Sequence, residues 1–143
     1  MQVDAKIATQ LLESSRLSRE QLVEAEKLSA RDKLTLGTTL VRMGLLTEPE
    51  YEQMLSRHYG VPAVRLEEVR IPAEVVSLVP SEVATKFQVI PIARIGRQLT
   101  LAMANPQNIF IVDDVKFITG LDVKAVVCAE SAIKKAIDRY YDQ

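Results

Sequence analysis

The chain has 143 residues, of which 48% are hydrophobic and 26% are charged. That length and apolar content fit one globular domain or two small ones. The net charge is −1, from 18 basic and 19 acidic residues that are well interspersed, so the sequence offers no basic field for nucleic acid and no charged tail.

A single cysteine, Cys128, excludes a disulfide within the chain and a cysteine-based zinc cluster, and it favours a reducing compartment. The N-terminal segment MQVDAKIATQ lacks the apolar region of a signal peptide. No apolar run is long enough to span a membrane. We therefore expect a cytoplasmic protein with no direct membrane insertion.

Residues 4–30 and 36–59 are predicted to form two helical hairpins of the same plan, joined by residues 31–35. When the chain is shifted by 29 residues, apolar positions of the first hairpin fall on those of the second. Ser18 with Gln21 and Thr47 with Glu50 both have the S/T-x-x-E/Q spacing of a helix capping box. Matching caps as well as matching cores indicate a tandem repeat.

The turns of the two copies differ. Gly44 stands where the first helix of the second copy must end, and glycine takes the left-handed conformation there at little cost. The matching residue of the first copy is Ser15, a poorer choice. Gly37 near the start of the second copy corresponds to Ala8. It indicates either close approach of another backbone or a ligand, or a flexible junction between loop and helix.

The second half of the chain contains both helices and strands. Short helices are expected at 73–78 and 81–87, strands at 89–95, 98–104 and 123–128, and longer helices at 109–119 and 131–141. Gly96-Arg97 predicts a two-residue hairpin turn, and Pro91 indicates an edge position or a bulge. The third strand is apolar almost throughout, which favours a central place in a largely antiparallel sheet.

The predicted fold class is α+β. A helical subdomain of residues 1–60 holds the pair of hairpins, and residues 61–143 form a small three-stranded sheet with helices packed on one face. Ile111, Val115 and Ile118 are expected to line the buried face of the helix at 109–119.

No catalytic site is predicted. The sequence contains no G-x-x-x-x-G-K-[ST] phosphate loop. His58 is the only histidine and has no partner with which to build a metal site, so a surface or helix-capping role is expected. Cys128 follows an apolar strand, which indicates a buried, inert thiol. We expect no catalytic residue and no bound metal.

Three segments together resemble the N-terminal domain of type II secretion and type IV pilus assembly ATPases. They are LGTTLVRMGLLTEPEYEQMLSRHYGVPAVRL, AMANPQNIFIVDDVKFITG and AIKKAIDRYY. The resemblance implies a bacterial, non-catalytic domain that in the family precedes an ATP-hydrolysing motor and docks on an inner-membrane platform partner. The motor's phosphate loop does not occur in these 143 residues, so we expect an excised piece or a stand-alone relative.

One branch of that family binds cyclic di-GMP through two tandem motifs. Each motif opens with Arg-Leu-Gly, has a central glycine and closes with glutamine. In the second copy Leu36, Gly37, Leu40 and Gly44 match, whereas Thr35 replaces the arginine and His58 the glutamine. The first copy departs further: Lys6 stands for arginine, and Ile7, Ala8, Ser15 and Ser29 occupy the other motif positions, while Leu11 and Leu22 match. These thirteen residues are the candidate cyclic di-GMP site.

Two functions remain open. The resemblance and the missing recognition groups favour a docking and regulatory domain that binds a platform or accessory protein of a secretion or pilus machine. The alternative is a sensor that binds cyclic di-GMP between the hairpins, with no required cofactor. Self-association through the apolar hairpin faces is a third, minor possibility.

Overall fold

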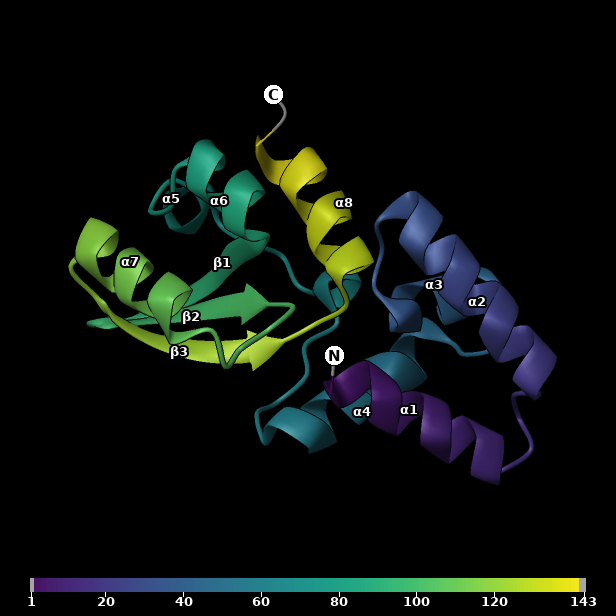
Figure 1. Cartoon of the computed structure of the whole chain (residues 1–143). Coiled ribbons are helices and arrows are strands. Elements are labelled where there is room, and N and C mark those ends of the chain that lie inside the picture. The colour runs from purple at the N-terminus through teal and green to yellow at the C-terminus, as the bar shows by residue number, and fades with distance from the viewer. Residues whose placement is uncertain (1, 142–143) are drawn as a thin grey trace. The chain divides into compact units, whose positions relative to one another are not determined.

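The computed structural model describes residues 2–141, and the chain divides into two compact units, residues 1–58 and 59–143. The first unit contains four helices: α1 (Gln2–Glu13), α2 (Arg19–Asp32), α3 (Leu36–Arg42) and α4 (Glu48–Tyr59) (Figure 1). Apolar side chains from all four helices make its core, including Ile7, Leu11, Ala25, Leu40 and Leu55. The two predicted helical hairpins are confirmed.

The second unit is built on a three-stranded sheet. Its strands β1 (Val89–Ile95), β2 (Gln98–Met103) and β3 (Asp122–Val127) lie in the order β1-β2-β3. The predicted two-residue turn is confirmed, because Ile95 pairs with Gln98 across Gly96-Arg97. The β1 strand lies at an edge and its register shifts between Pro91 and Ala93, as a proline within a strand predicts.

Two expectations about the sheet are wrong. The β2 strand pairs antiparallel with β1 but parallel with β3, so the sheet is mixed. The reason is that α7 (Ile109–Thr119) connects β2 to β3, and a helical crossover returns the chain in the same direction. The central strand is β2, whereas β3 is an edge strand whose buried residues are confined to its end, at Val126 and Val127. Ala63 makes an isolated parallel bridge with Val127, which covers that end.

The remaining elements of this unit are η1 (Leu66–Glu68), α5 (Ala73–Val76), α6 (Ser81–Phe87) and α8 (Glu130–Tyr141). Figure 1 shows α6, α7 and α8 on the same side of the sheet. The last two residues of α8, both tyrosines, attach the helix to the rest of the unit. The Tyr140 hydroxyl donates to the Val69 carbonyl (3.3 Å) and accepts from the Ile71 N–H (3.2 Å). The Tyr141 hydroxyl lies 2.9 Å from the carbonyl oxygen of Val79 and 3.1 Å from that of Val76.

Helix α7 has the predicted bounds and ends at Gly120, which takes φ +70°. The prediction of which residues line its buried face is only partly correct. Val115 is completely buried and Ile111 is half-buried, but Ile118 is 44% exposed. Because α7 packs chiefly on the edge strand β3, only a narrow strip of the helix is covered.

Candidate functional site

The turns of the first unit show that the 29-residue repeat is structural. In copy one Ser15 takes φ +61°, the Ser15 N–H donates to Leu12 and the Arg16 N–H donates to Leu11. In copy two Gly44 takes φ +77°, and the amides of residues 44 and 45 donate to the carbonyls of residues 41 and 40. Both of these hydrogen bonds and the positive φ of the first turn therefore recur 29 residues later, although the first turn holds serine where glycine is favoured.

Both predicted capping boxes are formed. The Ser18 hydroxyl accepts from the Gln21 N–H (3.1 Å), while the Gln21 side chain accepts from the Ser18 N–H (2.9 Å). Thr47 and Glu50 exchange the same two bonds, at 3.2 and 3.0 Å. Each second helix thus begins at the residue that the sequence indicates.

An ion pair links the two copies. The Arg16 guanidinium donates two hydrogen bonds to the Glu50 carboxylate, at 2.8 and 3.0 Å. The bond from Arg16, followed by those from the backbone and the hydroxyl of Thr47, lowers the pKa of Glu50 from 4.5 to about 2. The turn of copy one is therefore held to the first turn of α4 in copy two.

The free backbone N–H groups at the start of α3 donate hydrogen bonds to side chains of the same unit. Thr35 caps the helix, its hydroxyl accepting from the Thr38 N–H (3.2 Å), and the buried Asp4 carboxylate accepts from the Leu36 N–H (3.3 Å). A Cβ added at Gly37 would overlap the ring of Tyr51. Gly37 is therefore needed because a side chain of α4 packs against it, which is neither of the two alternatives that the sequence suggested.

The structure separates the thirteen candidate residues into groups. Five are buried in the hairpin core, two form the turns, and the Ser29 hydroxyl donates to the Leu34 carbonyl. The core group is Ile7, Ala8, Leu11, Gly37 and Leu40, and the turn group is Ser15 and Gly44. Leu22, Thr35 and Leu36 are half-buried.

A cavity of about 280 Å³ lies between α1 and the end of α4 and contains three of the candidates, Lys6, Ile7 and His58. The other lining residues are Val3 and Gln10 of α1 and Met54 and Arg57 of α4. These four were not singled out from the sequence. Val3 and Gln10 lie three and four residues from Lys6 and Ile7, while Met54 lies four residues before His58 and three before Arg57. This helical spacing is the signal that could have identified them.

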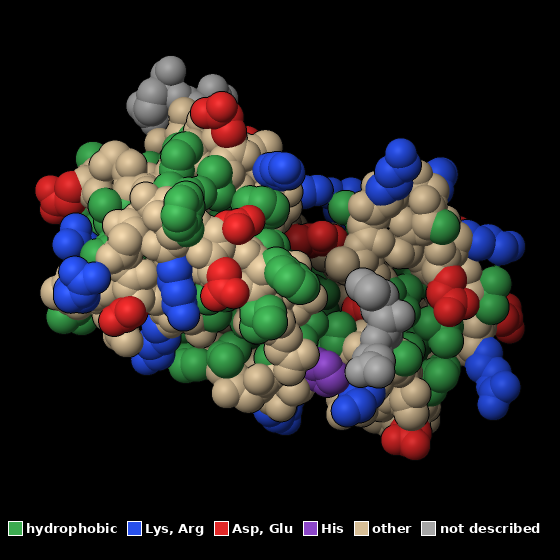
Figure 2. Space-filling model, turned by 60° about the vertical axis from the view of Figure 1, so that its left-hand side comes forward, with side chains coloured by type: hydrophobic (Ala, Val, Ile, Leu, Met, Phe, Trp, Pro, Cys, Tyr) green, Lys and Arg blue, Asp and Glu red, His purple; other side chains and the backbone are tan. Residues whose placement is uncertain are grey.

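The lining of this cavity carries basic groups and no carboxylate. Lys6 is the counterpart of the opening arginine of the first motif, and His58 of the closing glutamine of the second. Figure 2 shows the histidine, coloured purple, at the surface. The cavity therefore brings together the first position of one copy and the last position of the other. Such a setting can hold a negatively charged group.

Other site types receive no support from the described part of the chain. Residues 2–141 contain no group of three His, Cys, Asp or Glu side chains placed to share a metal ion. None of the helices among them is long and apolar enough to cross a bilayer. Cys128 is fully buried, as predicted.

Comparison with known families identifies the domain. The sequence model of the MshEN domain matches residues 59–143. The chain belongs to the MshEN domain family. The match covers the whole second unit, and the curated relatives extend the similarity through the repeat.

The type IV pilus assembly ATPase PilB of Myxococcus xanthus is 38% identical over 139 residues, which cover 97% of this chain and 25% of the relative. PilB of Thermus thermophilus is 30% identical over 142 residues, covering 98% and 16%. The type II secretion system protein E of Xanthomonas campestris is 28% identical over 144 residues, covering 98% and 25%. The chain therefore spans a quarter or less of the length of these relatives.

Two solved structures share the fold of this MshEN protein. MshE, in a structure described as containing cdg, has a TM-score of 0.64 and 26% identity, covering 92% of this chain and 95% of the other. The N-terminal domain of XpsE has a TM-score of 0.64 and 26% identity, covering 96% and 95%. The predicted relationship to the N-terminal domains of pilus and secretion ATPases is confirmed, and the matched region does not include the ATPase motor.

Proposed function

We propose that this MshEN domain is a non-catalytic regulatory domain that binds cyclic di-GMP in the cavity between α1 and α4. The observation that carries the proposal is the convergence of Lys6 and His58 on one cavity. These residues come from opposite ends of the tandem repeat, so a ligand there would contact both copies. The structure of MshE with cdg supports the same ligand for a relative of the same fold.

The rest of the repeat limits how the ligand would bind. The hydroxyl of Thr35 caps α3, and Tyr51 packs against Gly37. The first residues of the second motif therefore leave little backbone accessible to a ligand. The cavity, at about 280 Å³, is at the low end of the roughly 300–1,000 Å³ typical of small-molecule sites. It would hold one phosphate and part of one guanosine, with the rest of the dinucleotide on the surface.

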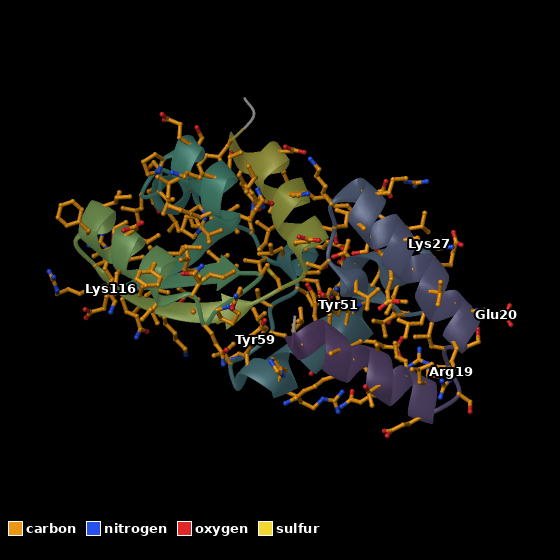
Figure 3. All side chains as sticks on the ribbon, viewed as in Figure 1. Arg19, Glu20, Lys27, Tyr51, Tyr59 and Lys116 are labelled. Atoms are coloured by element: carbon orange, nitrogen blue, oxygen red, sulfur yellow. The ribbon has the colours of Figure 1, made fainter. Side chains whose placement is uncertain are left out.

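Isothermal calorimetry with the purified chain and cyclic di-GMP tests this function. We expect saturating heat that disappears in Lys6→Glu, because the reversed charge repels the phosphate. Lys27→Glu makes the same charge change on α2, away from the cavity (Figure 3), and should bind as the unaltered protein does. Absence of heat at millimolar ligand would reject the proposal.

A second candidate function is docking to a protein of the secretion or pilus machine, and the surface of α7 favours it. Among the described residues, four of the six exposed large hydrophobic side chains belong to α7. They are Ile109 (64% exposed), Phe110 (77%), Phe117 (88%) and Ile118 (44%). A concentration of apolar side chains on one exposed helix is typical of an interaction surface.

The charges on α7 indicate the chemistry of such a partner. Asp113 and Asp114 lie between Phe110 and Phe117 along the helix, and helical spacing places them beside the two rings. Antiparallel pairing of two copies of α7 would bring the aspartates of both copies together at the centre, where like charges repel. We therefore favour a platform protein whose contact surface is apolar and carries lysine or arginine.

Binding of the chain to purified cytoplasmic domains of its own machine's platform proteins tests the docking function. Phe117→Ser should abolish binding without loss of stability, because the ring is exposed. Ile95→Ser is the matched control, since Ile95 is 80% exposed in the same unit but lies on β1. Equal binding by the two variants would exclude α7 as the docking surface.

A further inference from the structure

Arg57 lies in the same cavity but outside the positions of the repeat motif. On α4, Arg57 and His58 follow Met54 by three and four residues, so both lie next to Met54 on the helix surface. Lys6 and Gln10 line the cavity from α1. The structure thus places a guanidinium beside the two motif residues that meet there.

The positive charge of Arg57 is not neutralised within the described chain. Neither Arg57 nor Lys6 forms an ion pair or a side-chain hydrogen bond with another described residue. A neighbouring cavity, on the same face of α4, is lined by Arg16, Glu50, Gln53, Met54 and Arg57 among others. Its one carboxylate, that of Glu50, is already bound by Arg16 through two hydrogen bonds.

Two unpaired cations at one concave site favour an anion. A guanidinium can donate two parallel hydrogen bonds to a phosphate, whereas the Lys6 ammonium acts as a point charge. Cyclic di-GMP carries two phosphodiester groups. A cavity that offers the Arg57 guanidinium and the Lys6 ammonium can bind one of them. Lys6, which stands where the first motif opens with arginine, provides charge at this cavity but no fork.

We infer that Arg57 is a phosphate-binding residue of this cavity and supplies there the guanidinium that the first repeat lacks, because Lys6 stands in place of its opening arginine. The inference rests on the proposed cyclic di-GMP function and adds to it a residue that the motif does not contain. It also implies that binding depends on the fork of Arg57 as well as on its charge.

The test compares dissociation constants for cyclic di-GMP, measured by calorimetry at one ionic strength of about 0.15 M, where the Debye length is about 8 Å. Arg57→Gln should weaken binding by about tenfold or more, and Arg57→Lys by an intermediate factor, because charge returns without the fork. Arg19→Gln is the control: it removes the same charge from the exposed start of α2 (Figure 3) and should leave the affinity within about twofold, since surface charges beyond a Debye length are largely screened. Circular dichroism confirms that each variant is folded.

The possible results separate the two claims. If the unaltered protein binds and Arg57→Gln binds as tightly as Arg19→Gln, the role of Arg57 is refuted while the cyclic di-GMP function stands. Equal affinities of Arg57→Lys and Arg57→Gln would refute the role of its charge, and recovery to full affinity in Arg57→Lys would refute the role of the fork. If the unaltered protein does not bind, the proposed function itself fails.

Discussion

Substitution of Gly37 by alanine tests the packing that holds the second hairpin together. Alanine is favoured over glycine in a helix by about 1 kcal/mol, so propensity alone predicts stabilisation. The new Cβ, however, would overlap the Tyr51 ring, which is 4% exposed and cannot swing into solvent without losing its packing. Overpacking of this kind costs about 1–3 kcal/mol, so after the gain in helix propensity we expect a net destabilisation of up to about 2 kcal/mol.

The second half of this test is Tyr51→Leu, which removes the overlapping ring. In that background Gly37→Ala should stabilise the chain by up to about 1 kcal/mol, because the double variant reproduces Ala8 and Leu22 of copy one. Urea denaturation followed by circular dichroism of all four proteins gives the coupling between the two positions. Stabilisation by Gly37→Ala in the unaltered background would refute the close packing of Gly37 and Tyr51.

Three further predictions concern single positions. Ser15→Gly should stabilise the first unit by about 0.5–1 kcal/mol, because serine is disfavoured at φ +61°; a lower urea midpoint would contradict this. For Glu50, the pKa is lowered from 4.5 to about 2, so the Glu50 carboxylate stabilises the folded state above pH 4.5, and this stabilisation is lost as the pH falls towards 2. The difference in unfolding free energy between the unaltered protein and Glu50→Gln should therefore shrink over that range. A difference that does not change with pH would refute the ion pair. For Tyr141, burial raises the pKa from 10.0 to about 12, so the neutral Tyr141 hydroxyl stabilises the folded state below pH 10, and this stabilisation is lost as the pH rises towards 12. Tyr141→Phe should lower the unfolding free energy by about 1 kcal/mol at pH 7 and reduce the loss of stability at alkaline pH. Equal dependence of stability on pH in the two proteins would contradict this.

The helices and their caps could be predicted from the sequence because they depend on neighbouring residues. Ser18 with Gln21 and Thr47 with Glu50 close their capping boxes within one helical turn, and both form as expected. The hairpin turn at Gly96 depends equally on local backbone conformation, and it too is as predicted.

The sheet order and the role of Gly37 depend on contacts between residues far apart in the chain. The apolar residues of β3 suggested a central strand, but Val127 is buried at an edge by a bridge to Ala63. Gly37 is required by Tyr51, fourteen positions away on another helix. Neither partner could be assigned from local pattern, because hydrophobic periodicity shows that a face is covered and not what covers it.

The candidate site was predictable only in part, for the same reason. The motif positions pointed to Lys6 and His58, and the structure places both at one cavity. Arg57 and Gln10 belong to that cavity because α1 and α4 face each other there, which no motif position records. Most of the other motif residues serve the hairpin core and its turns, so the repeat is first of all a structural unit.

A titration of isotopically labelled protein with cyclic di-GMP, followed by amide NMR shifts, tests the central claim most directly. We predict saturable shifts at the amides and side chains that surround the cavity, namely those of Lys6, Gln10, Arg57 and His58, with the amides of α7 unaffected. No shift at millimolar ligand, or shifts confined to residues 59–143, would contradict a cyclic di-GMP site between α1 and α4.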